Sequence, residues 1–287
     1  MFDLLQIADS LIKTMQQVIP MRPEIESELV KLKKDLEYYK NTYGFYGLKG
    51  GTETEDMDYE ELSFLKALSK DIMPLKVKIG GVEARTDIRF CHSVHVNSIL
   101  APMVESEYAL RNFVQTLKAL IPRADYEKIR KSINLETITG YRNIMEIVDS
   151  KFFEELDDIT AARSDLSASM NLVPDDPEVM RVTSQIVKIS RSKGKGTCVG
   201  GTITRQNFAA IAEGIVPDMI NSRHIIVNVE KAKKVGLNEV PEAMLEFEMD
   251  LFSVLGLLKP EKHYYYNNRI ELNRERLGKK KVLYSLP

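Results

Sequence analysis

The feature that most constrains the fold is an alternation of short apolar runs with amphipathic segments. Seven runs have the length and bounding residues of strands, and segments with helical periodicity lie between them. These runs span residues 44–51, 75–81, 96–106, 132–138, 157–166, 196–201 and 222–229. Such alternation predicts a parallel sheet with crossover helices. Seven units favour an α/β fold of the (β/α)8 TIM-barrel class over an open sheet, with the eighth strand degenerate or near the N-terminus.

Additional helices are expected at both ends of the barrel. Residues 2–19 carry one apolar stripe at helical spacing, and Pro23 marks the start of a second helix. Residues 240–258 predict a long helix, and the run Tyr264–Tyr266 resembles a surface or subunit contact. This run and the N-terminal stripe together suggest a homo-oligomer. We expect a single domain over residues 1–287, with N-terminal helices in 1–42, the barrel core in 43–229 and a helical extension in 230–287.

The composition excludes several functional classes. The chain carries 40 Lys and Arg against 42 Asp and Glu, interspersed, so we expect no nucleic-acid partner and no membrane surface. Its two cysteines, Cys91 and Cys198, are far apart, which argues against a disulfide framework and a zinc site. The N-terminus contains Asp3 and Asp9 without a basic region, unlike a signal peptide, and no apolar run is long enough for a bilayer. The expected location is cytoplasmic.

Candidate functional residues follow the strand runs, because barrels bind ligands at the carboxyl ends of their strands. Glu136 ends the fourth run and Asp165 the fifth. Two carboxylates from adjacent strands could hold a hard cation such as Mg²⁺ or Mn²⁺. The residues alone leave a second interpretation equally open, in which each carboxylate pairs with a Lys or Arg at the rim. Other polar or glycine residues at these strand ends are Lys49, Glu53, Glu55, Lys78, Gly80, Gly81, Glu83, Glu105, Arg163, Gly200, Gly201 and Arg223.

Several motifs resemble one known family. The stretch INLETITGYRNIMEIV, followed by DDITAARSDLSASM, resembles the metal-binding core of the hydroxy-oxo-acid aldolase and citrate lyase β-subunit family, which is HpcH/HpaI-like and belongs to the phosphoenolpyruvate/pyruvate superfamily. VNSILAPMVESEYAL resembles the family's strand that carries P-M-V-E. KIGGVEARTDI and APMVESEYAL resemble a poorly characterised branch of it. The resemblance extends from about residue 44 to 229.

The resemblance implies roles for individual residues. Glu136 and Asp165 would be the metal ligands, and Lys78 would stabilise an enolate where the family has Arg. The substrate carboxylate would lie against backbone N–H groups from Ala162 through Ser164 to Asp165. In total, we assign Lys49, Lys78, Arg163 and Glu105 as catalytic, and Glu53, Gly80, Gly81, Glu83, Ala162, Ser164 and Arg223 as substrate-binding. The family's Glu-His pair is replaced by KGGTETED, so Lys49, Glu53 or Glu55 is left as the acid or base.

The function implied by the resemblance is a carbon–carbon lyase or aldolase that depends on Mg²⁺ or Mn²⁺. Its substrate would be a pyruvate-, oxaloacetate- or phosphoenolpyruvate-like acid that reacts through a metal-stabilised enolate. One alternative is a citrate-lyase-like acyl-CoA lyase. Another is a barrel that has lost catalysis and binds a metabolite or a partner protein. The missing histidine supports this last alternative, whereas the retained charges of Glu136, Asp165, Lys78 and Arg163 argue against it.

Overall fold

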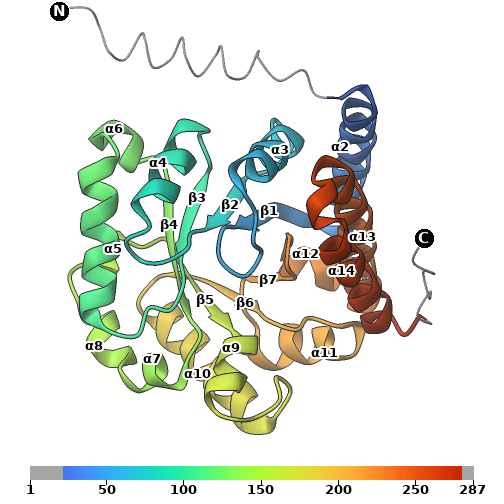
Figure 1. Cartoon of the computed structure of the whole chain (residues 1–287). Coiled ribbons are helices and arrows are strands. Elements are labelled where there is room, and N and C mark those ends of the chain that lie inside the picture. Colours follow the sequence, from blue (N-terminus) through green and yellow to red (C-terminus); the bar gives the residue numbers. More distant parts are fainter. Residues whose placement is uncertain (1–21, 280–287) are drawn as a thin grey trace, which may run out of the picture.

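A computed structural model describes residues 22–279 and shows a closed eight-stranded barrel surrounded by helices (Figure 1). The strands pair in chain order, and the last pairs with the first. They are β1 (Phe45–Gly51), β2 (Leu75–Lys78), β3 (Ser98–Ala101), β4 (Arg130–Leu135), β5 (Asp158–Ala162), β6 (Gly196–Gly200), β7 (Met219–Asn221) and β8 (Ile225–Asn228). The expected α/β barrel fold is therefore confirmed.

The direction of β8 departs from the repeated strand–helix unit. All neighbouring pairs from β1 to β7 are parallel, whereas β8 runs antiparallel to both β7 and β1. The strand that the apolar pattern missed is β7, which has three residues and lies directly before the run at 222–229 rather than near the N-terminus. Only Ser222, Arg223 and His224 separate β7 from β8, so no helix intervenes. The β7–β8 turn consequently lies at the carboxyl end of β7, on the same rim as the other strand ends.

Helices cover the outside of the barrel, and local sequence signals start several of them. Asp58 accepts hydrogen bonds from the N–H groups of Glu60 and Glu61, while the Glu61 side chain accepts one from Asp58, which forms a capping box. The helices that follow the strands are α3 (Tyr59–Ser69), α4 (Arg85–Ser93), α5 (Glu107–Leu120), α6 (Arg123–Tyr126), α7 (Ile138–Arg142), α8 (Ile144–Val148), α9 (Arg163–Ser169), α10 (Pro177–Ser192), α11 (Arg205–Ala210) and α12 (Val229–Val235), with short 3-10 or π turns at Phe153–Glu155, Ile211–Ile215 and Pro260–Lys262. None of the described helices is long and apolar enough to cross a membrane.

Three further helices pack together at one side of the barrel: α2 (Pro23–Tyr43), α13 (Glu239–Leu258) and α14 (His263–Arg276) (Figure 1). Helix α13 contacts both α2 and α14. Pro23 stands in the first turn of α2, as expected, and the stripe at 2–19 lies outside the described residues. In the tyrosine run, Tyr264 is exposed but Tyr266 is buried, so the run is not a continuous surface. The proposed division of one domain into 1–42, 43–229 and 230–287 stays a prediction.

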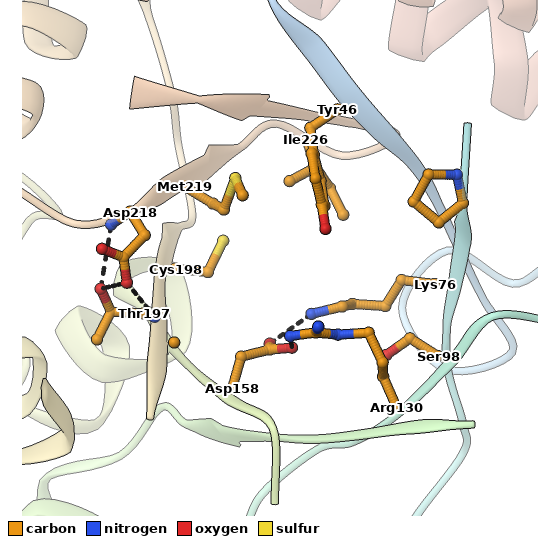
Figure 2. A pocket seen from close by; sticks show the side chains of 12 residues that line it. Tyr46, Lys76, Ser98, Arg130, Asp158, Thr197, Cys198, Asp218, Met219 and Ile226 are labelled. Carbon is orange, nitrogen blue, oxygen red and sulfur yellow. Dashed lines mark hydrogen bonds and ion pairs between the residues drawn. The ribbon is translucent and has the colours of Figure 1, made fainter. Parts of the chain in front are cut away.

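The amino-terminal end of the barrel holds a compact charged cluster (Figure 2). Lys76 Nζ lies 2.5 Å from Asp158 Oδ1, and Arg130 approaches the other oxygen of the same carboxylate at 3.4 Å. Burial disfavours the charge of Asp158, but Lys76 and Arg130 hold its pKa below the ordinary value. The apolar side chains of Met219 and Ile226 lie across a small cavity from this cluster. The Asp158 carboxylate at this end is therefore compensated by cations of the chain.

Candidate active site

A second pocket opens at the other end of the barrel, where the strands end. It encloses about 710 Å³, including open space at its mouth. Its walls come from the ends of six strands, the β7–β8 turn and α14. Seven of the residues assigned from the sequence line it: Lys49, Lys78, Glu136, Ala162, Ser164, Asp165 and Arg223. The fold thus brings together assigned residues as far apart in the sequence as Lys49 and Arg223.

The two carboxylates assigned to a metal both face this pocket. Glu136 is buried, and its oxygens accept hydrogen bonds at 2.8 Å from the Met103 N–H and from Asn134 Nδ2. Asp165 lies in the first turn of α9 and has no hydrogen bond or ion pair within the described part of the chain. Burial raises the pKa of Glu136 to about 7, with a further contribution from the Asp165 charge, although the Met103 N–H and Lys78 oppose the shift.

The donor atoms at this point fit a hard divalent cation. Asn134 Oδ1 is buried in the same pocket and has no hydrogen-bond partner in residues 22–279. It adds a carbonyl oxygen to the two carboxylates. Between Pro23 and Lys279, no group of three His, Cys, Asp or Glu side chains is arranged for a metal. Mg²⁺ commonly uses one or two protein carboxylates and keeps several waters, so a set of Glu136, Asp165 and Asn134 suits it.

Lys78 supplies a fixed positive charge beside these carboxylates. Its Nζ lies 2.5 Å from Glu53 Oε2 and 3.7 Å from Glu55 Oε2. Burial opposes the charge, but Glu55, the Glu53 hydrogen bond and Glu136 raise the pKa of Lys78 above its ordinary value. Lys78 therefore stays protonated at neutral pH and is a source of charge rather than a base. Glu53 is half-buried at the rim and reaches the site through this ion pair.

Glu55 is the anion at the centre of the cationic side of the pocket. Its carboxylate is 3.1 Å from Lys49 Nζ and 3.9 Å from Arg223. Burial alone would raise its pKa, but Lys49, Lys78 and Arg223 together lower it. Gly51 permits this arrangement, because a Cβ there would lie 2.6 Å from a Glu55 oxygen. Glu55 consequently stays ionised and holds three cations around the pocket.

The β5–α9 turn forms another wall. Ser164 Oγ lies 3.0 Å from Thr202 Oγ1, which joins this turn to the loop after β6. Gly201 approaches the turn so closely that a Cβ would lie 2.4 Å from the Ser164 backbone nitrogen, and its φ of 84° is in the left-handed region. Any side chain at this position would push the two loops apart. Ala162 and Ser164, two residues with small side chains, thus line the pocket at this wall.

Arg163 points away from the pocket although both of its neighbours line it. Its side chain is fully buried and donates hydrogen bonds to Asp175 Oδ1 at 2.6 Å and to the Gly201 carbonyl oxygen at 2.8 Å. Two more bonds reach the carbonyl oxygens of Pro174 and Thr202. The guanidinium therefore ties the β5–α9 turn to two adjacent loops. Its assignment as a catalytic residue stays a prediction that this geometry does not support.

Four other assigned residues also lie outside the pocket lining. Glu105 accepts a hydrogen bond of 2.5 Å from Thr137 Oγ1, and Glu83 is exposed and bonded to Asn112. Gly80 donates its N–H to Asp87 within the turn before α4, next to Gly81. The roles given to Glu105, Gly80, Gly81 and Glu83 stay predictions, because none of these residues lines the pocket.

Some pocket residues had no assignment from the sequence. Asn134 lies near the end of β4, two residues before Glu136, which directly follows the strand, so the period-two rule could have placed both side chains on the same side. Arg276 comes from α14, and no local signal identifies it. The one histidine near the site, His224, is buried; its Nδ1 donates to the Lys49 carbonyl oxygen at 2.8 Å, and burial lowers its pKa. This neutral ring supports the β7–β8 turn and does not line the pocket.

The fold and the site define a barrel protein with carboxylates and a lysine grouped at the strand ends. A family model described as HpcH/HpaI aldolase/citrate lyase matches residues 65–236. This match covers more than half of the chain, so the protein belongs to the HpcH/HpaI aldolase/citrate lyase family. Membership of this family supports an enzyme of the lyase or aldolase class. No curated protein matches the chain.

Several solved structures share the fold. Citrate synthase SbnG superposes with a TM-score of 0.51 at 19% identity, over 65% of this chain and 89% of that one. An HpcH/HpaI aldolase/citrate lyase family protein from Burkholderia cenocepacia gives 0.52 at 14% identity, over 67% and 92%. The HpcH/HpaI aldolase from Desulfitobacterium hafniense gives 0.54 at 13% identity, over 66% and 81%. At these identities the likeness shows the fold alone.

Proposed function

We propose that this protein is a divalent-metal-dependent carbon–carbon lyase or aldolase acting on a pyruvate- or oxaloacetate-like 2-oxo acid. One observation carries the proposal. Glu136 and Asp165 line the same pocket, and neither has a Lys or Arg ion pair in the described chain, although Lys78 lies close enough to influence the pKa of Glu136. A pair of uncompensated carboxylates is costly to keep beside a buried site unless a cation joins them. The family is also generally metal-dependent.

The residues that would hold Mg²⁺ or Mn²⁺ are Glu136 and Asp165, with Asn134 Oδ1 beside them. When bound, the ion supplies a Lewis acid that polarises the 2-oxo group. Lys78 contributes a second positive charge in the same pocket, already oriented by Glu53 and Glu55. Such preoriented charge stabilises the negative oxygen that develops as the substrate's carbon–carbon bond forms or breaks. Lys49, in the same wall of the pocket, would orient the substrate's carboxylate, and Arg223 adds a further positive charge there.

Binding of Mg²⁺ and of pyruvate, measured by isothermal titration calorimetry, tests the metal site directly. The variant Asp165→Ala is expected to lose Mg²⁺ affinity by at least about tenfold while its circular dichroism spectrum stays unchanged. Asp149→Ala is the matched control, because Asp149 is exposed, pairs with Lys193 at 2.6 Å and does not line the pocket. Full Mg²⁺ affinity in the Asp165→Ala variant would falsify the proposal.

Turnover separates an active lyase from a barrel that only binds. With Mg²⁺ present, wild-type protein is expected to release pyruvate from 4-hydroxy-2-oxo acids, and Asp165→Ala is expected to abolish this. Binding of Mg²⁺ and pyruvate without turnover on any such acid would instead indicate the catalytically altered barrel. Turnover confined to acyl-CoA thioesters would indicate the citrate-lyase-like alternative.

The wider expectations from the sequence remain part of the proposal. They are a single-domain organisation, self-association into a homo-oligomer and a cytoplasmic location. Light scattering coupled to size-exclusion chromatography tests self-association. A mass equal to that of the 32.7 kDa chain at micromolar concentration would contradict it.

A further inference from the structure

Helix α14 reaches the pocket although it lies beyond the residues that match the family model, which end at position 236. Three hydrogen bonds, two from the helix itself and one from Lys262 directly before it, anchor it beside the β1–α3 loop. The Tyr266 hydroxyl and Lys262 Nζ both donate to the buried carboxylate of Glu61, the latter at 2.8 Å. The Tyr265 hydroxyl donates to the Glu55 carbonyl oxygen at 3.2 Å. The position of α14 relative to the pocket is therefore set by specific bonds at its N-terminal half.

The C-terminal half of α14 places Arg276 in the pocket wall. Its guanidinium has no carboxylate within ion-pair distance in residues 22–279, and its hydrogen bond is a long one of 3.5 Å to Asn273 Oδ1. Glu248, the carboxylate whose charge acts on Arg276, already accepts hydrogen bonds from Ser222 Oγ, the His224 N–H and Asn273 Nδ2 at 2.7, 2.6 and 3.0 Å. Arg276 is thus a pocket cation whose charge is not used by an ion pair.

Arg223, on the β7–β8 turn, is also a pocket cation, and its ion pair is a long one. Its carboxylate partner, Glu55, is 3.9 Å away and lies closer to Lys49 and Lys78. Burial lowers the pKa of Arg276, Glu248 opposes the shift, and the charges of Arg223 and Arg269 add to it. The cations therefore repel each other across this part of the pocket. An anion placed between Arg223 and Arg276 would relieve that repulsion.

We propose that Arg276 and Arg223 bind a second anionic group of the substrate, which makes the substrate a 2-oxo acid or enol ester with a further carboxylate or a phosphate. The inference deepens the proposed function and rests on it. The first anionic group of the substrate would lie by Lys49, Lys78 and the cation that Glu136 and Asp165 would hold, and the second would lie at the two arginines of the same pocket. Guanidinium groups suit this task, because their planar N–H donors match carboxylate and phosphate oxygens in pairs.

Calorimetric titration of the Mg²⁺-loaded full-length chain with three compounds tests the proposal. Pyruvate has one anionic group, 2-oxoglutarate has a second carboxylate, and phosphoenolpyruvate has a phosphate. We expect 2-oxoglutarate or phosphoenolpyruvate to bind about tenfold more tightly than pyruvate, the gain of one good charge-assisted interaction. Which of the two shows the gain identifies the second group as carboxylate or phosphate.

The variant Arg276→Gln should remove this gain and leave pyruvate affinity within about twofold, since a purely structural role would weaken all three compounds. Arg276→Lys should keep part of the gain, because it retains the charge but not the paired donors. Arg274→Gln is the matched control on the same helix; Arg274 pairs with Glu271 and does not line the pocket. The proposal would be overturned if Arg276→Gln lost affinity for pyruvate and for the dianions equally, or if Arg274→Gln lost dianion affinity to the same extent.

Succinate and inorganic phosphate separate this proposal from the proposed function, because they carry the anionic group without a 2-oxo group. Binding of either that depends on Arg276, together with no Mg²⁺-dependent binding of any 2-oxo acid, would support the arginine site and overturn the 2-oxo acid chemistry. Mg²⁺-dependent pyruvate binding without any preference for dianions would support the proposed function and overturn the arginine site. If Arg276→Gln changes the binding of no dianion, the arginine site is ruled out in either case.

Discussion

The two ends of this barrel contain similar charged residues but pair them differently. At the amino-terminal end, Lys76 and Arg130 both contact Asp158, so this carboxylate has two cationic partners (Figure 2). At the carboxyl end, Glu136 and Asp165 have no cation at ion-pair distance within the described residues. Cations of the chain already compensate Asp158, whereas Glu136 and Asp165 are the pair that a bound cation would stabilise. The difference separates charges that serve the fold from charges available for binding.

The pKa shifts follow the same division. Asp158 has its pKa lowered by Lys76 and Arg130 despite burial, so its charge is compensated in the folded chain. Burial raises the pKa of Glu136 to about 7, so its charge is only partly compensated. Groups with such perturbed pKa values in a cleft are typical of functional sites. The same residue chemistry therefore gives a structural cluster at one end and a candidate active site at the other.

The largest expected effect comes from exchanging aspartate for alanine at each end. Asp158→Ala leaves Lys76 without its partner inside the barrel and is expected to lower the free energy of unfolding by about 3–5 kcal/mol. Asp165→Ala removes a carboxylate without a partner and should change this free energy by less than about 1 kcal/mol. Urea denaturation of both variants gives the comparison. Similar losses at the two positions would show that the ends do not differ in this way.

A second prediction concerns Lys78 and turnover. Lys78→Ala should lower kcat by about 100-fold, because it removes a preoriented charge from the pocket, while Mg²⁺ affinity stays within a few-fold. Lys78→Arg should restore part of the activity, since it keeps the charge. Lys76→Ala, at the other end, serves as the contrast and should reduce stability more than kcat. A Lys78→Ala enzyme with wild-type kcat would contradict the role assigned to this residue.

A third prediction uses pH. The folded-state pKa of Asp158 is below its ordinary value, so its contribution to stability is present above about pH 4 and is lost as the pH falls through the folded pKa. The free energy of unfolding should therefore fall on acidification below about pH 4. Asp158→Asn should flatten part of this dependence, whereas Asp149→Asn at the surface should leave it unchanged. An unchanged acid slope in Asp158→Asn would count against the ion cluster.

The smallest expected effect is at Glu105, whose side chain bonds to Thr137 and does not line the pocket. Glu105→Gln should cost about 1 kcal/mol of stability through the weakened hydrogen bond. Its kcat/KM should stay within about threefold of wild type in the same lyase assay. A fall of more than about tenfold in kcat/KM would instead restore Glu105 to the catalytic group assigned from the sequence.

The sequence by itself determined the class of fold and the main carboxylates of the site. Strand and helix periodicities are local properties of the chain, so the alternation of runs predicted the barrel. Glu136 and Asp165 follow neighbouring parallel strands, and such strand ends share one rim, which is why their convergence was predictable. Asn134 was within reach of the same reasoning, because it lies two residues before Glu136 at the end of β4.

Only the tertiary structure decided which charges face the pocket. Arg163 and Ser164 are adjacent in sequence, yet the first turns outward to Asp175 and the second lines the cavity. The reversed direction of β8 was also hidden, because three residues of β7 are too few to show a period and a run of apolar residues has no direction. Arg276 reaches the pocket because α14 packs on α13 and is bonded to Glu61 and Glu55. Such contacts join distant parts of the chain and depend on packing, which no local pattern records.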